Sequence, residues 1–205
     1  MDLARPLLVA TPTLDGDVLE VLAGADVEFS GRELARQVGR GSVEGIRRAA
    51  DRLVGQGIVL CRPAGSAHLY RLNREHLAAP SIEGLACMRE ELLARLRALI
   101  SAWELQPCVA LLFGSAARGE ARAASDLDVL VIRPAGHEPD SSPWQDQLLA
   151  LQRSASAWTG NDTRVLEYGE GEVAAASSER VLEEALHDGV ELFGKRRVLR
   201  RLISA

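Results

Sequence analysis

Two hydrophobic runs in the middle of the chain, separated by a glycine-serine break and a polar spacer, restrict what this region can fold into. The first run covers residues 108–113 and stops at Gly114 and Ser115, and the second covers residues 127–132. Short apolar runs bounded by turn signals are typical of buried strands. We therefore predict two buried strands, joined by a connection that begins with a glycine-serine turn.

Two aspartates, Asp126 and Asp128, accompany the second run. Side chains alternate between the faces of a strand, so both carboxylates are predicted to point the same way. Two neighbouring carboxylates repel each other, and a cation relieves this repulsion. Mg²⁺ prefers one or two carboxylates together with phosphate oxygens and water. A Gly-Ser turn leaving a strand offers backbone N–H groups and a hydroxyl to phosphate. The pattern predicts a metal–triphosphate site.

Composition narrows the class of protein. The chain has 205 residues, 47% hydrophobic residues and a net charge of −5, which fits one large or two small globular domains and argues against bulk coating of nucleic acid. No apolar stretch approaches the roughly 18 to 20 residues of a membrane helix, and the N-terminal segment does not read as a signal peptide. Cys61, Cys87 and Cys108 lack metal-ligand spacing. The predicted location is the cytoplasm, with no membrane partner.

The first 80 residues carry signals for three helices followed by a hairpin. Helical spacing covers residues 12–24, 30–39 and 42–57, and strand-like segments at residues 58–62 and 68–72 flank a Pro-Gly turn. Ser30 and Ser42 are the predicted helix caps, Ser30 as part of a capping box. This order resembles a winged helix-turn-helix, so we predict such a domain at residues 1–80 and a second domain at residues 81–205.

The second part of the chain predicts a compact α/β domain. We expect one long amphipathic helix at residues 81–105, the two buried strands, a helix at residues 144–158, a third strand within residues 161–172 and a capped helix at residues 177–194. The basic residues 195–201 are predicted to belong to a solvated tail or helix surface. The fold class is α/β (α+β), with a small mixed sheet flanked by helices.

The segment FGSAARGEARAASDLDVLVI, residues 113–132, resembles the signature of the DNA polymerase β-like nucleotidyltransferases. The signature is a hydrophobic residue, Gly-Ser, a spacer of about ten residues and Asp-hydrophobic-Asp. The resemblance extends over about residues 85–195 and is nearest to the minimal nucleotidyltransferases, several of which carry an N-terminal winged helix. It implies that Gly114 and Ser115 hold the nucleotide phosphates, and that Asp126 and Asp128 bind two Mg²⁺ ions. Arg118 would neutralise phosphate charge.

The family usually adds a third carboxylate from a later strand. Glu167, in the segment RVLEYG, is the candidate for this catalytic and metal-binding position. Asp162 and Glu170 are alternatives, and a site without a third carboxylate is another. The identity of the third carboxylate affects the predicted catalysis more than the predicted nucleotide binding.

Four arginines of the N-terminal region are candidates for DNA contacts through the winged helix: Arg40, Arg47, Arg48 and Arg62. The same 80 residues contain ten arginines and ten acidic residues, so bulk charge does not favour DNA over protein. Because winged helices also dock proteins, the partner of this domain stays open.

The function predicted first is Mg²⁺-dependent transfer of a nucleoside monophosphate from ATP, or another NTP, to a hydroxyl group. The acceptor would be a protein partner or a small molecule; the resemblance implies an antitoxin-type enzyme acting on a toxin partner as one case. The alternative is a DNA-binding transcriptional regulator whose transferase fold binds nucleotide or a partner without turnover. A purely structural interaction module is the third reading.

Overall fold

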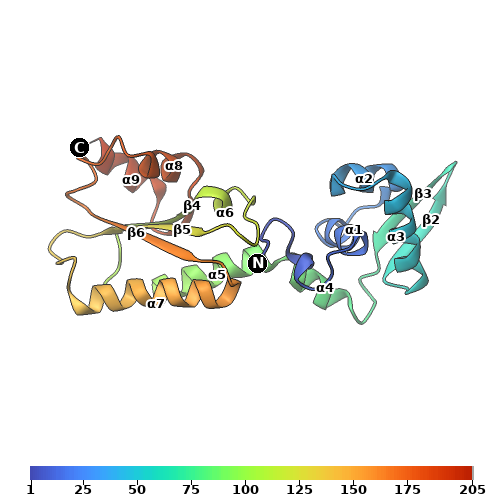
Figure 1. The fold of residues 1–205 in the computed structure, drawn as a ribbon, viewed down its shortest axis with the longest axis horizontal. Helices are drawn as coiled ribbons and strands as arrows, with labels where there is room; N and C mark the ends of the chain where they lie inside the picture. Colours follow the sequence, from blue (N-terminus) through green and yellow to red (C-terminus); the bar gives the residue numbers. More distant parts are fainter. Residues whose placement is uncertain (205) are drawn as a thin grey trace. The chain divides into compact units, whose positions relative to one another are not determined.

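The computed structural model describes residues 1–204, and their contacts divide the chain into two compact units (Figure 1). The N-terminal unit contains Asp2 and Ala4–Arg89. The C-terminal unit contains Met1, Leu3 and the chain from Glu90 onward. Each unit has its own hydrophobic core and is described separately.

The N-terminal unit is built from helices and a three-stranded antiparallel sheet of order β1-β3-β2. Its elements, in chain order, are the 3-10 helix η1 (Pro6–Val9), α1 (Leu14–Ala23), β1 (Phe29–Ser30), α2 (Gly31–Val38), α3 (Val43–Gly55), β2 (Val59–Ala64), β3 (Ala67–Leu72) and α4 (Ala79–Ala86).

Local signals explain where its helices begin. The Ser30 hydroxyl accepts the N–H of Glu33, and the Glu33 carboxylate accepts the N–H of Ser30, so the predicted capping box is confirmed. The Ser42 hydroxyl caps α3 by accepting the N–H of Gly45 at 3.0 Å. The helices bury their apolar faces around a common core, whose fully buried members include Leu22, Leu34, Ile46 and Tyr70.

The C-terminal unit is a mixed sheet with helices on both faces, as the sequence predicted. Its elements are α5 (Met88–Ser101), β4 (Val109–Phe113), α6 (Gly114–Ala117), β5 (Leu127–Arg133), α7 (Ser142–Thr159), β6 (Thr163–Gly169), α8 (Arg180–Asp188), β7 (Val190–Phe193) and α9 (Arg196–Ile203). The strand order is β6-β5-β4-β7. β5 and β6 are parallel, and β4 is antiparallel to both β5 and β7.

The alternation of side chains in β5 separates two cores. Leu127, Val129 and Val131 pack with α5 and α7 on one face of the sheet. Leu130 and Ile132 pack with α8 and α9 on the other. Figure 1 shows α7 along one side of the sheet and α8 and α9 along the opposite side. A residue's position in β5 therefore fixes which pair of helices it faces.

The predicted single helix at residues 81–105 is wrong, because the chain forms two helices with a break at Cys87. Ile82 and Leu85 of α4 pack against the core of the N-terminal unit, whereas Leu96 and Ile100 of α5 lie in a core of the C-terminal unit. The apolar pattern is thus shared between two cores. It continues across the break with no glycine or proline at residue 87 to mark it.

The predicted helix at residues 177–194 is also wrong in its second half. The helix α8 ends at Asp188, and the next residues form β7, the edge strand beside β4. A Cβ atom on Gly189 would lie 2.2 Å from the Ala185 carbonyl oxygen, so the turn from α8 into β7 requires glycine. The basic segment that follows folds as α9, which buries Leu199.

Among the described residues, we find no helix that combines the length and apolar character needed to cross a membrane.

Glu20 on α1 supplies a pH-dependent test of the N-terminal unit. Burial, reinforced by the charge of Asp17, raises the pKa of Glu20 from 4.5 to about 6. The folded protein then binds this proton more tightly than the unfolded chain, so the stability that Glu20 contributes is full below pH 4.5 and is lost as the pH rises through about 6. We expect Glu20→Gln to stabilise the protein by about 1 kcal/mol at pH 7, after discounting for solvent screening, and to change little below pH 4.5. Urea unfolding across this range measures the difference; a variant less stable than wild type at pH 7 would contradict it.

Candidate nucleotide site

The glycine-serine turn lies at the end of β4, directly beside Asp128 of β5. Phe113, the last residue of β4, is opposite Asp128 in the antiparallel register. Gly114 follows with a φ of 70°, a left-handed conformation that favours glycine. A Cβ atom at this position would lie 3.0 Å from an Asp128 carboxylate oxygen. Glycine therefore allows the carboxylate and the turn to approach each other.

The two aspartates lie on the face of the sheet that α8 covers. Asp128 has the same orientation in β5 as Leu130 and Ile132, and Asp126 immediately precedes the strand. Both side chains are partly buried. Burial raises the pKa of Asp128, and the negative charges of Asp126 and Glu184 add to the rise while the Arg164 guanidinium opposes it. The pair is thus an electrostatically unfavourable arrangement that a cation would relieve.

Arg164 is the cation that the fold itself supplies. It is the residue of β6 that pairs with Asp128 in the parallel register, so its side chain leaves the sheet on the same face. Its guanidinium forms an ion pair with Asp126 at 2.9 Å. The sequence did not identify Arg164 as a site residue, because it predicts a strand here but not the register of that strand against β5.

Glu167, the predicted third carboxylate, is not brought to the pair. It is opposite Val131 in the register, which places it on the face covered by α5 and α7. Its carboxylate instead accepts a 2.6 Å hydrogen bond from the buried Arg133. Glu167 faces away from the aspartates because side chains of β6 alternate faces, and the interval from Arg164 to Glu167 is odd.

The two alternatives lie at opposite ends of β6. The carbonyl of Asp162 accepts the N–H of Leu127 at 2.8 Å, so Asp162 is at the same end of the sheet as Asp126, with an exposed side chain. Glu170 follows β6 at the other end, where its carboxylate accepts the N–H of Ala135. Within residues 1–204, no three His, Cys, Asp or Glu side chains form a group able to hold a metal ion.

The donor set nevertheless fits Mg²⁺ that is shared with phosphate. Asp126 and Asp128 provide two carboxylates on one face, which is the number that Mg²⁺ commonly takes from a protein when phosphate oxygens and water complete its shell. The sequence did not identify Glu184 of α8 as a site residue, since nothing in its helical pattern points to the sheet. Its charge acts on Asp128, and its carboxylate accepts a hydrogen bond from Arg180 at 2.7 Å.

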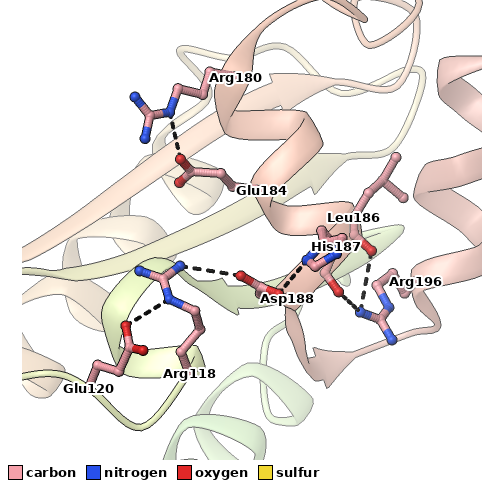
Figure 2. A network of polar contacts seen from close by, with 8 residues as sticks. All are labelled: Arg118, Glu120, Arg180, Glu184, Leu186, His187, Asp188 and Arg196. Carbon is pink, nitrogen blue, oxygen red and sulfur yellow. Dashed lines mark hydrogen bonds and ion pairs between the residues drawn. The ribbon is translucent and has the colours of Figure 1, made fainter.

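Arg118, at the end of α6, is held by acidic side chains, as Figure 2 shows. Its guanidinium pairs with Glu120 at 2.9 Å and with Asp188 at 3.3 Å. Asp188 also contacts His187 at 2.5 Å, and these partners lower the pKa of Asp188, the His187 hydrogen bond most strongly. The two carboxylates use the Nε and Nη1 atoms of Arg118, so its charge is already paired within the protein.

Asn161 holds the segment that leads into the aspartate pair. Its buried side-chain amide donates to the carbonyl of Ser125 at 2.8 Å and to that of Arg122 at 3.1 Å. An amide so placed fixes the backbone just before Asp126. No motif in the sequence singled it out.

The four arginines predicted to contact DNA each form an ion pair within the N-terminal unit. Arg40 pairs with Asp17 at 2.5 Å, and Arg62 pairs with Glu28. Arg47 and Arg48 both pair with Glu44, at 3.3 Å and 3.2 Å. Arg47 also lines a cavity of about 500 Å³, together with Arg32 and His68 among others.

Comparison with known proteins identifies the segment that contains the aspartate pair. Residues 96–188 match the nucleotidyltransferase domain family. Over this segment the chain is similar to nucleotidyltransferase domains. The match covers the sheet from β4 to β6 together with α8, and therefore includes every residue of the site described above. No curated protein matches the chain.

Two solved toxin–antitoxin structures show weak similarity to the chain. One is a mutant of the toxin–antitoxin MntA–HpeT, with 12% identity over 55% of this chain and 80% of that chain and a TM-score of 0.39. The other is a toxin–antitoxin with AMP-PNP, with 17% identity over 56% of this chain and 81% of that chain and a TM-score of 0.36. At these TM-scores neither similarity decides the fold or the function.

Neutralising the two aspartates separately tests the electrostatics of the site. Asp128→Asn removes the charge that burial and Asp126 disfavour, so we expect a higher Tm at pH 7 in the presence of EDTA. Asp126→Asn also relieves repulsion but loses the ion pair with Arg164. An exposed ion pair contributes about 0–1 kcal/mol, so we expect little net change in Tm. Thermal unfolding of both variants against wild type measures this.

The gain in stability that we expect from Asp128→Asn depends on pH. A raised pKa means that wild-type stability is lost as the pH rises through that pKa, so the advantage of the variant shrinks when the pH is lowered and the wild-type carboxyl becomes neutral. A variant that melts below wild type at pH 7 would instead assign a structural role to the carboxylate.

Proposed function

We propose that the C-terminal domain transfers a nucleoside monophosphate from an NTP, with ATP as the first candidate, to a hydroxyl group. The observation that carries this proposal is the juxtaposition of Asp126, Asp128 and the Gly114 turn on one face of the sheet, inside the segment that matches the nucleotidyltransferase family. In the reaction, the acceptor oxygen bonds to the α-phosphorus, the bond to the bridging oxygen breaks, and pyrophosphate leaves. The hydroxyl proton passes to solvent.

Each site residue has a distinct role in this proposal. The backbone of Gly114 and the hydroxyl of Ser115, which is only partly buried, bind the phosphates at the end of β4. Asp126 and Asp128 hold Mg²⁺, and Asn161 keeps the preceding segment in place. Arg118 exchanges Glu120 or Asp188 for a phosphate, because a guanidinium matches either group with two N–H donors. When bound, the metal neutralises the triphosphate and lowers the pKa of the attacking hydroxyl.

The acceptor is proposed to be a protein partner, with a small molecule as the other case. The sequence resemblance motivates an antitoxin-type enzyme that modifies a toxin partner. Two Mg²⁺ ions stay a prediction from that resemblance. Glu167 no longer belongs to the proposed ligand set, because it lies on the other face of the sheet and pairs with Arg133.

Thermal unfolding with Mg²⁺ and ATP tests the nucleotide site. At a ligand concentration about tenfold above Kd, binding adds about 1.4 kcal/mol, which is roughly 3–5 °C in Tm for a chain of this size. We expect this rise in wild type and its absence in Asp126→Asn/Asp128→Asn. The matched control is Glu138→Gln/Asp140→Asn, which removes the same charge from exposed side chains beyond the other end of β5.

Transfer itself is tested with ATP labelled at the α- or the γ-phosphate. Incubation of wild type with cell extract and α-labelled ATP is expected to label an acceptor that γ-labelled ATP leaves unlabelled, because pyrophosphate carries the γ label away. An acceptor labelled by γ-labelled ATP but not by α-labelled ATP would indicate phosphoryl transfer and contradict the proposal. No rise in Tm for wild type at millimolar ATP would contradict nucleotide binding.

We further propose that the N-terminal unit is a winged helix-turn-helix whose boundary lies near residue 80. The order of α1, α2, α3 and the β2–β3 hairpin supports this proposal. DNA binding by this unit is the second candidate function. The observation that favours it is the cavity that contains Arg47, Arg32 and His68, three side chains suited to phosphate.

Fluorescence anisotropy with duplex DNA tests the second function. A phosphate contact by Arg47 predicts that Arg47→Ala weakens binding equally for all sequences and lowers the slope of log K against log salt by about 1. Arg95→Ala, which removes an exposed arginine of α5 in the other unit, is the control and should leave the slope unchanged. Absence of DNA binding by wild type at low salt would reject this function.

A further inference from the structure

The place beside Asp128 on the neighbouring strand is occupied by an arginine. In the parallel register, β6 presents Arg164 directly opposite Asp128 and on the same face. A carboxylate at this position would be the natural third ligand of a metal bound to the pair. Glu167, the first position that the sequence offered for that role, lies on the other face of β6, and Asp162 and Glu170 flank the strand.

The guanidinium of Arg164 lies beside both aspartates. It forms a 2.9 Å ion pair with Asp126, and Arg164 is opposite Asp128 on the same face of the sheet. It therefore provides at this face the positive charge that a bound metal would provide. A guanidinium has N–H donors and no lone pair available to a metal. An incoming cation consequently cannot use Arg164 as a ligand and is repelled by its charge.

The ion pair has the properties of a displaceable contact. The Arg164 side chain is 63% exposed and that of Asp126 is 32% exposed, so water can solvate both groups after they separate. Exposed ion pairs are weak. By contrast, the pair between Arg133 and Glu167 on the other face has side chains only 9% and 19% exposed. Of these two pairs, the one at the proposed site is the easier to open.

We propose that Arg164 is a resident counter-ion of the aspartate pair, which a divalent cation displaces from Asp126 on binding. The inference rests on the proposed function because it takes Asp126 and Asp128 as the metal-binding residues. Arg164 then sets the metal affinity of the site without being a ligand. In the metal-free protein it keeps the two carboxylates partly neutralised.

Titration with Mn²⁺ alone, followed by the electron paramagnetic resonance of free Mn²⁺, measures this competition on the full chain without nucleotide. We expect Arg164→Gln to bind Mn²⁺ about fivefold more tightly than wild type, the factor that corresponds to loss of one exposed ion pair. Arg164→Asp, which adds a carboxylate opposite Asp128, is expected to bind more tightly still. Arg95→Gln is the matched control, because it removes an exposed arginine paired with Glu91 on α5, and should bind as wild type does.

The variant Asp128→Asn separates failure of this inference from failure of the proposed function. If wild type and Arg164→Gln bind Mn²⁺ equally, and Asp128→Asn abolishes that binding in both, the metal site stands and the role of Arg164 is wrong. If Asp128→Asn leaves Mn²⁺ binding unchanged in both backgrounds, the aspartate pair is not the metal site, and both proposals are overturned. Weaker binding by Arg164→Gln would also overturn the inference.

Discussion

The parallel pairing of β5 with β6 is the constraint on which the site depends. It aligns Asp128 with Arg164, and the alternation of the two strands sends both side chains to the face covered by α8 and α9. The same register sends Glu167 to the opposite face, where it pairs with Arg133. A shift of one residue in β6 would reverse both outcomes, because successive side chains point to opposite faces.

Charge pairing at this face produces a site that is largely neutralised by its own residues. Asp126 is paired with Arg164, and Arg118 is paired with Glu120 and Asp188. These pairs are partly exposed, so opening them costs little. A ligand that carries both signs of charge, as a metal–triphosphate does, offers new partners to the acids and to the arginines at once. This reciprocity makes such a ligand a better match than a metal or a simple anion alone.

The boundary between the two units falls inside a continuous amphipathic pattern. Ile82 and Leu85 of α4 serve the core of the N-terminal unit, and Leu96 and Ile100 of α5 serve a core of the C-terminal unit. A continuous amphipathic pattern reports that a face is buried, but it does not report which core buries it. In the C-terminal unit, β7 also shows that an apolar pattern alone does not decide the structure. Its four residues continue an apolar pattern after α8, and pairing with β4 makes them a strand.

The sequence by itself determined the features that depend on local chemistry. These are the Ser30 capping box, the buried strands on either side of the polar spacer, the Gly114 turn and the common orientation of Asp126 and Asp128, each decided by a few adjacent residues. Only the tertiary structure decided which residues face the aspartates, because strand register is set by packing and pairing between distant segments. For that reason the sequence did not identify Arg164 and Glu184 as neighbours of the aspartates. It offered Glu167 as the third carboxylate, and the structure places Glu167 on the other face of the sheet.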